Sequence, residues 1–318
     1  MNDNLRSPMT PSVCIIILNW NSNQDTLACL ASLGEMSYKN FRVVVVDNGS
    51  SNNSVEMLSP ISGIHLIENK TNLGFAGGNN VAIKYALGQN FDYVWLLNSD
   101  AVVEVDCLEK LVASAEKDAT IGLLSPVIYH RDRPDIIQHC GTRLNAGADG
   151  VHEADDIPIA RQWQDQAPET VILWGTAMLI KSTLIRKIGD LDAHLFAYSE
   201  DTDYSLRSSR AGFRNVTVFD AKIWHASTEG LRKPHFYYYT TRNAALMWRK
   251  YTSTYKFMKI CWWNFNRIKR LIEKFQDKPE LVHASKLGLW DGWTGTGGEY
   301  DPSRKLPIGA RAVFRLFG

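Results

Sequence analysis

Residues 41–50 read FRVVVVDNGS, a run of four valines that ends in small polar residues. An apolar run without polar alternation is typical of a strand buried on both faces, as in a parallel sheet covered by helices. Similar runs alternate with stretches of helical spacing: the predicted strands are 13–18, 41–47, 64–68 and 93–98, and the predicted helices are 23–33, 54–58 and 75–87. This alternation predicts an α/β fold, Rossmann-like, with a mostly parallel sheet and helices on both faces.

After residue 124 the pattern loosens. Residues 130–168, rich in Asp, Pro, Gly and Gln, read as a long excursion, and long loops of this kind often recognise substrate. Regular patterns return afterwards, with an ordered stretch at 171–180, a helix from about 200 to 211, a strand near 216–219, and helices at 234–250 and 254–276.

Composition narrows the class of protein. The 318 residues are 45% apolar and 22% charged, which is ordinary for a globular chain with one large domain and an appendage. A net charge of +1 gives no global attraction to nucleic acid, so we expect no nucleic-acid partner. Five scattered cysteines, none in a C-x-x-C pair, predict free thiols rather than disulfides or a thiolate metal site.

The start of the chain lacks the layout of a secretory signal. The first dozen residues, MNDNLRSPMTPS, have no basic segment followed by an apolar one. No stretch approaches the ~18–20 apolar residues that a spanning helix needs. We expect the protein to stay in the cytoplasm, either free or resting on the inner face of the cell membrane.

Polar clusters follow three of the predicted strands, at 19–21, 47–50 and 98–100. In a doubly wound sheet, ligands bind beyond the carboxyl ends of the strands. Each cluster alone is also ordinary turn chemistry, because Asn, Asp, Gly and Ser are common turn residues. Three clusters at one edge of the sheet favour a binding site.

Asp100 and His225 are candidate metal ligands. A carboxylate just past a buried strand suits Mg²⁺ or Mn²⁺ that bridges a diphosphate, and an imidazole can complete such a site. The alternatives are a strand-end turn or a helix N-cap at 98–100, and a purely structural histidine.

Residues 69–80, NKTNLGFAGGNN, form a glycine-rich segment ahead of a predicted helix. Glycine lets backbone approach a ligand, and a helix N-terminus offers amides to phosphate. The segment matches neither the P-loop nor the dinucleotide-binding fingerprint, which disfavours ATPase and dehydrogenase functions. An ordinary helix start remains the alternative.

Residues 196–207, FAYSEDTDYSLR, place three carboxylates within four positions between aromatic residues. Carboxylates gathered in this way are costly to bury, so they are either solvated or functional. One of them could act as a general base toward a hydroxyl group. The alternative is a helix start whose acids favour the helix dipole.

Together these segments resemble the family-2 glycosyltransferases of the GT-A fold, most closely the bacterial rhamnosyltransferase-type branch that builds cell-surface polysaccharides. The resemblance covers nearly all of residues 13–251. Its matching segments are VCIIILNWNS (13–22), VVVVDNGSSNNS (43–54), NKTNLGFAGGNN (69–80), WLLNSDAVV (95–103), WGTAMLIKSTLIRKIGDLD (174–192), FAYSEDTDYSLRSSRAGFR (196–214), WHAS (224–227) and YYYTTRNAALMWRKY (237–251).

The resemblance implies an inverting, metal-dependent glycosyltransferase with a nucleoside-diphosphate sugar donor. It favours dTDP-L-rhamnose and leaves UDP-galactose and UDP-N-acetylglucosamine open. The cofactor would be Mg²⁺ or Mn²⁺, and the acceptor a hydroxyl of a glycan or lipid-linked glycan. Residues 1–230 would form the GT-A domain, with a nucleotide half at 13–124 and an acceptor half at 125–230, followed by a helical extension at 231–318.

Each candidate site residue takes its role from the resemblance. Asp47 would bind the pyrimidine base, Asn19 and Asn21 would line the nucleotide pocket, and Asn72 and Gly74 would lie against the nucleoside and phosphates. In Asn98-x-Asp100, Asp100 would be the main metal ligand and His225 the second. Trp174 and Gly175 would border the donor sugar and acceptor, Asp201 would be the catalytic base, and Glu200 would bind acceptor hydroxyls or orient Asp201. Asn98 stands where many relatives have Asp, and Ser99 where this branch usually has proline.

The segment 242–274 is basic and rich in aromatic residues. It carries nine Lys or Arg residues against a single acid, Glu273. Such a helix is typical of one that lies on an anionic membrane surface. The alternative is a helix that packs its aromatic face on the catalytic domain and leaves its cations in water.

Two other function classes stay open from the sequence. A sugar-nucleotidyltransferase would need a glycine-rich, basic loop after the first strand, and residues 19–22 (NWNS) do not provide one. A non-catalytic nucleotide- or carbohydrate-binding protein is disfavoured by the presence of both Asp100 and Asp201.

Overall fold

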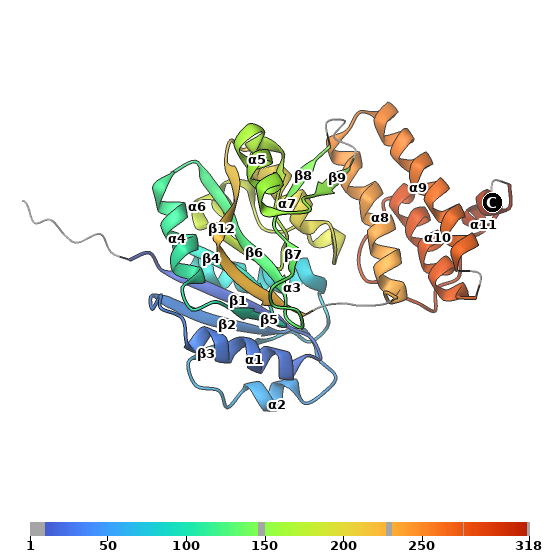
Figure 1. The fold of residues 1–318 in the computed structure, drawn as a ribbon. Coiled ribbons are helices and arrows are strands. Elements are labelled where there is room, and N and C mark those ends of the chain that lie inside the picture. Colours follow the sequence, from blue (N-terminus) through green and yellow to red (C-terminus); the bar gives the residue numbers. More distant parts are fainter. Residues whose placement is uncertain (1–9, 146–149, 227–230, 276, 317–318) are drawn as a thin grey trace, which may run out of the picture.

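The computed structural model describes residues 10–145, 150–226, 231–275 and 277–316 (Figure 1). Within these residues a nine-stranded sheet has the order β3-β2-β1-β4-β11-β6-β12-β5, with β7 paired to β6. Its strands are β1 (Val13–Asn19), β2 (Phe41–Asp47), β3 (Ile64–Glu68), β4 (Tyr93–Asn98), β5 (Ala101–Val103), β6 (Ile121–His130), β7 (Ile137–His139), β11 (Ala177–Lys181) and β12 (Arg214–His225).

The sheet is mixed but mostly parallel on its N-terminal side. Strands β1 to β4 pair in parallel, whereas β11 runs antiparallel to both β4 and β6. The register aligns Asn19 with Asp47 and Leu18 with Asn98. The polar clusters that follow three strands therefore meet at one edge of the sheet, as the sequence indicated.

Helices cover both faces of the sheet, and the apolar strand residues divide between two cores. One core packs against α1 (Asn23–Gly34), α2 (Ser54–Leu58) and α4 (Cys107–Lys117). The other packs against α3 (Gly74–Gly88), α6 (Ser182–Ile188) and α7 (Glu200–Arg210). This double covering explains why the valines of β2 need no polar alternation: Val44, Val45 and Val46 are all fully buried.

Three predictions for the part of the chain beyond residue 124 are wrong in detail. The excursion at 130–168 is not structureless, because it contains β7, β8 (Thr142–Leu144), β9 (Val151–Glu153) and α5 (Ile157–Gln166). The ordered stretch 171–180 divides into two strands, β10 (Val171–Ile172) and β11. Strand β10 pairs with β8, which in turn pairs with β9, whereas β11 belongs to the large sheet. Strand β12 is longer than predicted, so that His225 is its last residue instead of following it.

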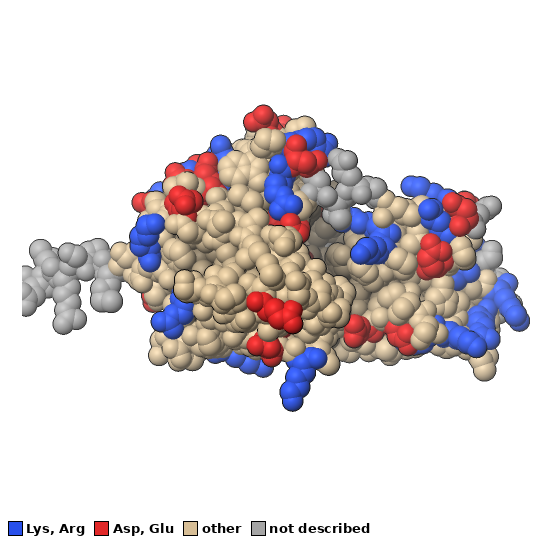
Figure 2. Space-filling view, turned by 90° about the horizontal axis from the view of Figure 1, so that it is seen from below, with Lys and Arg blue, Asp and Glu red and all other residues tan. Residues whose placement is uncertain are grey.

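The described part of the C-terminal segment is helical. It forms α8 (Pro234–Tyr251), α9 (Thr254–Lys274), α10 (Pro279–Thr294) and α11 (Ile308–Leu316), which lie together beside the sheet domain (Figure 1). Seen from below, the surface is hollowed between the two parts (Figure 2). Among the described residues, no helix has the length and apolar character needed to cross a bilayer. Residues 1–9 of the N-terminal dodecapeptide and Ser227 of the WHAS segment lie outside the described residues.

All five cysteines are free, as predicted. Burial raises the pKa of the Cys14 thiol to about 12, so this group stays protonated and unreactive.

Candidate active site

A buried polar network holds the ends of β1 and β2 together. The Asn19 amide donates to Asp47 Oδ2 at 2.8 Å, and the Ser50 backbone N–H donates to Asp47 Oδ1 at 2.9 Å. Asn21 joins the network through its backbone N–H, which donates to Ser50 Oγ, and through its side-chain oxygen, which accepts from Ser51 N–H. Asp47 is only 2% exposed, so its carboxylate is fixed in orientation beside the surface residue Asn21.

Asn48 organises the glycine-rich segment. Its side-chain amide donates to Asn72 Oδ1 at 2.9 Å and to the Gly74 carbonyl at 3.1 Å, while its oxygen accepts from Asn69 and from Leu73 N–H. Gly74 has φ +74, and a Cβ at this position would lie 2.4 Å from the Phe196 carbonyl oxygen. Only glycine fits here without strain. Because Gly74 has no side chain, the glycine-rich segment can pack directly against the loop that precedes α7.

Asp100 and His225 meet at the same edge of the sheet. Asp100 Oδ1 lies 3.1 Å from His225 Nε2, and the Asn98 amide nitrogen lies 3.2 Å from the same ring nitrogen. On its other side, His225 Nδ1 lies 2.8 Å from Gln138 Oε1, and the Gln138 amide nitrogen donates to the Ala226 carbonyl. Because Gln138 presents its oxygen, Nδ1 is the donor of that contact, and Nε2 faces both Asp100 and the Asn98 amide.

This arrangement fits a hard divalent cation. A carboxylate oxygen and an imidazole nitrogen 3.1 Å apart can be joined by a proton on Nε2 or can both bind a metal cation. Ligands on adjacent corners of an octahedron with bonds of ~2.1 Å are separated by ~3.0 Å, close to the distance between Asp100 Oδ1 and His225 Nε2. The described residues hold no group of three or more His, Cys, Asp or Glu side chains that could bind a metal. Remaining ligand positions would fall to water or to a bound phosphate.

The segment Trp174–Thr176 contacts the end of β4 and the start of α7. The Thr176 carbonyl accepts from Asn98 N–H at 2.9 Å, and the Gly175 N–H donates to Asp201 Oδ2 at 3.1 Å. A Cβ on Gly175 would lie 3.3 Å from the Phe75 ring and 3.6 Å from Asp201 Cβ. The end of β4, the glycine-rich segment and the start of α7 therefore converge on one short stretch of chain.

Trp174 is held by stacking. Its ring lies 4.1 Å from the ring of His139, centroid to centroid, at an interplanar angle of 17°. Burial lowers the pKa of His139 to about 3, so this imidazole stays neutral. A stacked, half-buried indole at this position presents a fixed apolar wall to the site.

Burial perturbs both carboxyls at the start of α7. It raises the pKa of Asp201, although hydrogen bonds from Gly175 N–H, Thr202 N–H and the Thr202 hydroxyl oppose the shift. Burial, and then the charge of Asp201, raise the pKa of Glu200 well above its usual range. Glu200 Oε2 is buried without a hydrogen-bond partner among the described residues, which fits a neutral carboxyl.

The third carboxylate of the cluster has a different environment. Asp203 is fully buried and binds Arg207 at 2.8 Å, Tyr251 at 2.7 Å and Lys250 at 3.2 Å. These cations and the tyrosine hydroxyl neutralise and satisfy it, so it joins helices instead of facing a ligand.

Sequence reasoning missed four residues that the structure places in or around this site: Asn48, Ser50, Phe75 and Gln138. The first three lie inside segments that were already singled out, and their neighbours drew the attention. No local signal marks Gln138, because it lies in the excursion after residue 130 and reaches His225 only through the pairing of β7 with β6.

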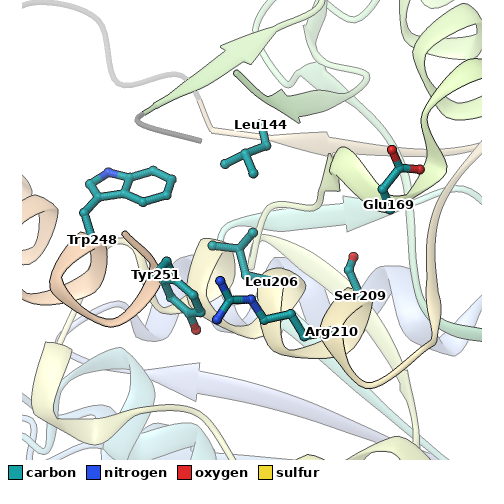
Figure 3. A pocket seen from close by; sticks show the side chains of 7 residues that line it. All are labelled: Leu144, Glu169, Leu206, Ser209, Arg210, Trp248 and Tyr251. Atoms are coloured by element: carbon teal, nitrogen blue, oxygen red, sulfur yellow. The ribbon is translucent and has the colours of Figure 1, made fainter. Parts of the chain in front are cut away.

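A cavity of about 230 Å³ lies away from this cluster, between α7, α8 and the β8 region (Figure 3). Its lining consists of Leu144, Glu169, Leu206, Ser209, Arg210, Trp248 and Tyr251, none of which was predicted as a site residue. The polar edge of the sheet is therefore the better candidate for chemistry.

A comparison with protein families matches residues 14–189 to "Glycosyl transferase family 2". The chain belongs to this family. It is a glycosyltransferase that uses a nucleotide-sugar donor, and its α/β fold is that of the GT-A structures.

Two relatives of this glycosyltransferase have names that state an activity. It is 23% identical over 253 residues to the dTDP-rhamnosyl transferase RfbF of Shigella flexneri, covering 76% of this chain and 81% of the relative. It is 28% identical over 231 residues to the galactofuranosyltransferase GlfT1 of Mycobacterium tuberculosis, covering 71% of this chain and 74% of that one.

A solved structure shares the fold. The mannosyltransferase PcManGT from Pyrobaculum calidifontis, in complex with GDP-Man and Mn²⁺, superposes with a TM-score of 0.57 at 17% identity. The match covers 97% of this glycosyltransferase, its C-terminal helices included, and 80% of the mannosyltransferase.

Proposed function

We propose that this glycosyltransferase moves a sugar, with inversion, from dTDP-L-rhamnose to a hydroxyl of a glycan or lipid-linked glycan during cell-surface polysaccharide synthesis. The observation that carries the proposal is the convergence on Trp174–Thr176, where Thr176 binds the Asn98 backbone and Gly175 binds Asp201. The strand end that leads to Asp100 and the proposed base Asp201 thereby contact the same three residues. The rhamnosyl transferase relative supports the donor, while UDP-galactose and UDP-N-acetylglucosamine are the alternatives to test.

The donor nucleotide is proposed to bind along the ends of β1 and β2. Asp47 accepts a hydrogen bond from the pyrimidine ring, and Asn19 and Asn21 fix the orientation of that carboxylate and line the pocket. Asn72 and Gly74 lie against the nucleoside and the diphosphate, where the N-terminal amides of α3 favour negative charge. In this arrangement residues 13–124 serve the nucleotide and residues 125–230 serve the acceptor.

Asp100 and His225 are the proposed ligands of Mg²⁺ or Mn²⁺, with Asn98 beside them. When bound, the cation neutralises charge that develops on the departing diphosphate. Gln138 keeps His225 in the tautomer whose Nε2 is free to bind.

Asp201 is the proposed general base. Its Oδ2 is oriented by Gly175 N–H and its Oδ1 by Thr202 N–H, so the carboxylate is held in one orientation. It takes the proton from the acceptor hydroxyl as that oxygen attacks the sugar carbon opposite the leaving diphosphate, which inverts the centre. Glu200, neutral and buried beside it, adds no second negative charge and orients the acceptor or Asp201.

The extension at 231–318 is proposed to rest on the inner face of the cell membrane through α9, which would bring the site near a lipid-linked acceptor. Four large side chains of α9 are more than half exposed: Tyr255, Met258, Trp262 and Trp263. Lysines and arginines are interleaved with them, and this combination is favoured at the interface of an anionic bilayer.

Replacement of Asp201 by Asn tests the base. We expect transfer to fall ~10²–10⁴-fold, because the amide cannot accept the hydroxyl proton, while donor affinity changes little. Asp165→Asn, at an exposed position of α5, is the matched control. Near-wild-type turnover of D201N would discard the assignment.

The donor is decided by a thermal-shift screen of nucleotide sugars with Mn²⁺ or Mg²⁺, since a ligand that binds the folded state raises its melting temperature. The product then separates the remaining functions. A sugar-nucleotidyltransferase releases pyrophosphate, a glycosyltransferase releases nucleoside diphosphate, and a non-catalytic binding protein releases neither.

A further inference from the structure

The loop that leads into α7 is held in a strained conformation. Phe196, Tyr198 and Ser199 have φ values of +64, +68 and +70, although none is glycine. Such conformations are strained for residues other than glycine and persist only where the surroundings impose them. Ser199 directly precedes Glu200 and Asp201, so this loop sets where α7 begins and where Asp201 points.

Asn243 of α8 satisfies the carbonyls of this loop. It is fully buried, and its amide nitrogen lies 2.9 Å from the Leu195 carbonyl, 2.8 Å from that of Ala197 and 2.6 Å from that of Tyr198. An amide nitrogen carries two hydrogens, so the three carbonyls share them, and Arg242 supplies a further donor to the Leu195 carbonyl.

Arg242 fixes the orientation of that amide. Its Nε donates to Asn243 Oδ1 at 2.9 Å, which turns the Asn243 nitrogen toward the loop. Its Nη2 donates to the Leu195 carbonyl at 2.7 Å and its Nη1 to the Gly298 carbonyl at 2.5 Å. The guanidinium is fully buried over the rings of Tyr238 and Tyr239, so it cannot turn away without losing all of these partners.

The end of α8 holds α7 a second time, one turn beyond the loop. Tyr251 and Lys250 bind the buried carboxylate of Asp203, as described above. Figure 3 shows Tyr251 beside Arg210 and Leu206 of α7, at the margin of the cavity between the two helices. Helix α8 therefore contacts the loop before Asp201 and the helical turn after it.

The same loop also contacts the glycine-rich segment (residues 69–80). The Phe196 carbonyl accepts from Ala76 N–H at 3.1 Å, and Gly74 leaves no room for a side chain against Phe196. The loop therefore packs between the glycine-rich segment and the start of α7.

We propose that Arg242 and Asn243 are positioning residues for the reaction: they hold the strained loop 195–199 in the one conformation that aims Asp201 at the acceptor hydroxyl. This inference rests on the proposed role of Asp201 as the base. It gives the C-terminal helices a part in catalysis that does not depend on contact with either substrate.

A double-mutant cycle with Asn243→Ala and Asp201→Asn tests the proposal. In the wild-type background, N243A is expected to lower kcat about 10–100-fold while the donor dissociation constant changes less than about twofold, since misplacement by ~1 Å costs such factors. In the D201N background, N243A is expected to cost less than about threefold, because the group that it positions is already disabled. Asn264→Ala is the matched control: Asn264 is also a buried helical asparagine, and it lies in α9.

The outcomes are distinct. Full turnover by N243A, or an equal loss from N243A in both backgrounds, would overturn the positioning role and leave the base assignment intact. High turnover by D201N would remove the base assignment and the inference with it. If alanine at 243 prevents folding, Asn243→Ser keeps one donor and carries the same comparison, with a smaller loss expected.

Discussion

At the scale of single residues, Gln138 decides how His225 can act. Its oxygen faces Nδ1 at 2.8 Å and its amide nitrogen donates to the Ala226 carbonyl, so the amide has one preferred orientation. Partners of this kind fix the tautomer of a metal-ligating histidine, and their loss typically costs 10–100-fold in metal affinity.

We therefore expect two substitutions of Gln138 to change the affinity for Mn²⁺ differently. Gln138→Leu removes the acceptor, and we expect it to raise the Mn²⁺ concentration for half-maximal activity about 10–100-fold, with little loss at saturating metal. Gln138→Glu keeps an acceptor for Nδ1–H and should bind Mn²⁺ at least as well as the wild type. Equal metal titrations for both variants and the wild type would show that Gln138 does not support His225.

The raised pKa of Glu200 predicts that the stability of the protein depends on pH. Its pKa in the folded protein lies well above the usual value, first because of burial and then because of Asp201. Between the unfolded and the folded pKa the folded chain binds more protons, so the free energy of unfolding decreases as pH rises through that interval. Glu200→Gln removes this loss because glutamine is neutral at every pH.

We expect the melting temperature of E200Q to exceed that of the wild type increasingly as the pH is raised from about 4.5 toward neutrality. Thermal melts of both proteins across that range measure the difference, and Glu169→Gln, which removes an exposed carboxyl, is the matched control. A difference between E200Q and wild type that does not vary with pH would mean that Glu200 is not held protonated.

At the scale of elements, the predictions succeed where burial alone sets the pattern. Strands β2, β3 and β4 have the predicted bounds; β2 and β4 are buried apolar runs covered by helices on both sides, whereas β3 is a partly exposed edge strand. The break at residues 173–176 was missed because Leu173, inside it, is as fully buried as the strand residues Ile172 and Ala177 that flank it. The small β8–β9–β10 sheet was missed because its strands have two or three residues each, too few to show a period.

The site divides in the same way. Residues at strand ends, such as Asp47 and Asp100, follow buried runs and could be predicted from position. Gln138 and Asn243 could not, since each acts on a residue more than 40 positions away through contacts that only the fold creates. Local sequence therefore predicts the proposed binding and catalytic residues better than the residues proposed to position them.

At the scale of the whole molecule, α9 has two apolar faces. Ile260, Phe265 and Ile268 are buried against the neighbouring helices. Trp262 and Trp263 on the other side are 63% and 58% exposed, although a monomer gains nothing from an exposed indole. Lys259 lies 4.6 Å from the ring of Tyr255, so cations and aromatic rings share this face. Lys and Arg are also frequent over the helical part in the view from below (Figure 2).

This composition predicts binding to anionic vesicles. A half-exposed indole can bury ~100 Å² of apolar surface in the bilayer interface, at ~25 cal/mol per Å², so the Trp262→Ala/Trp263→Ala double variant should partition at least ~100-fold more weakly. Lys256→Glu/Lys259→Glu should weaken binding ~10-fold or more and flatten its salt dependence, since each cation near the surface contributes ~1 kcal/mol. Val105→Ala and Lys117→Glu, at exposed positions of the sheet domain, are the controls for co-sedimentation. Equal sedimentation of the α9 variants and these controls would contradict the membrane surface and leave the transfer reaction untouched, because none of these side chains belongs to the proposed site.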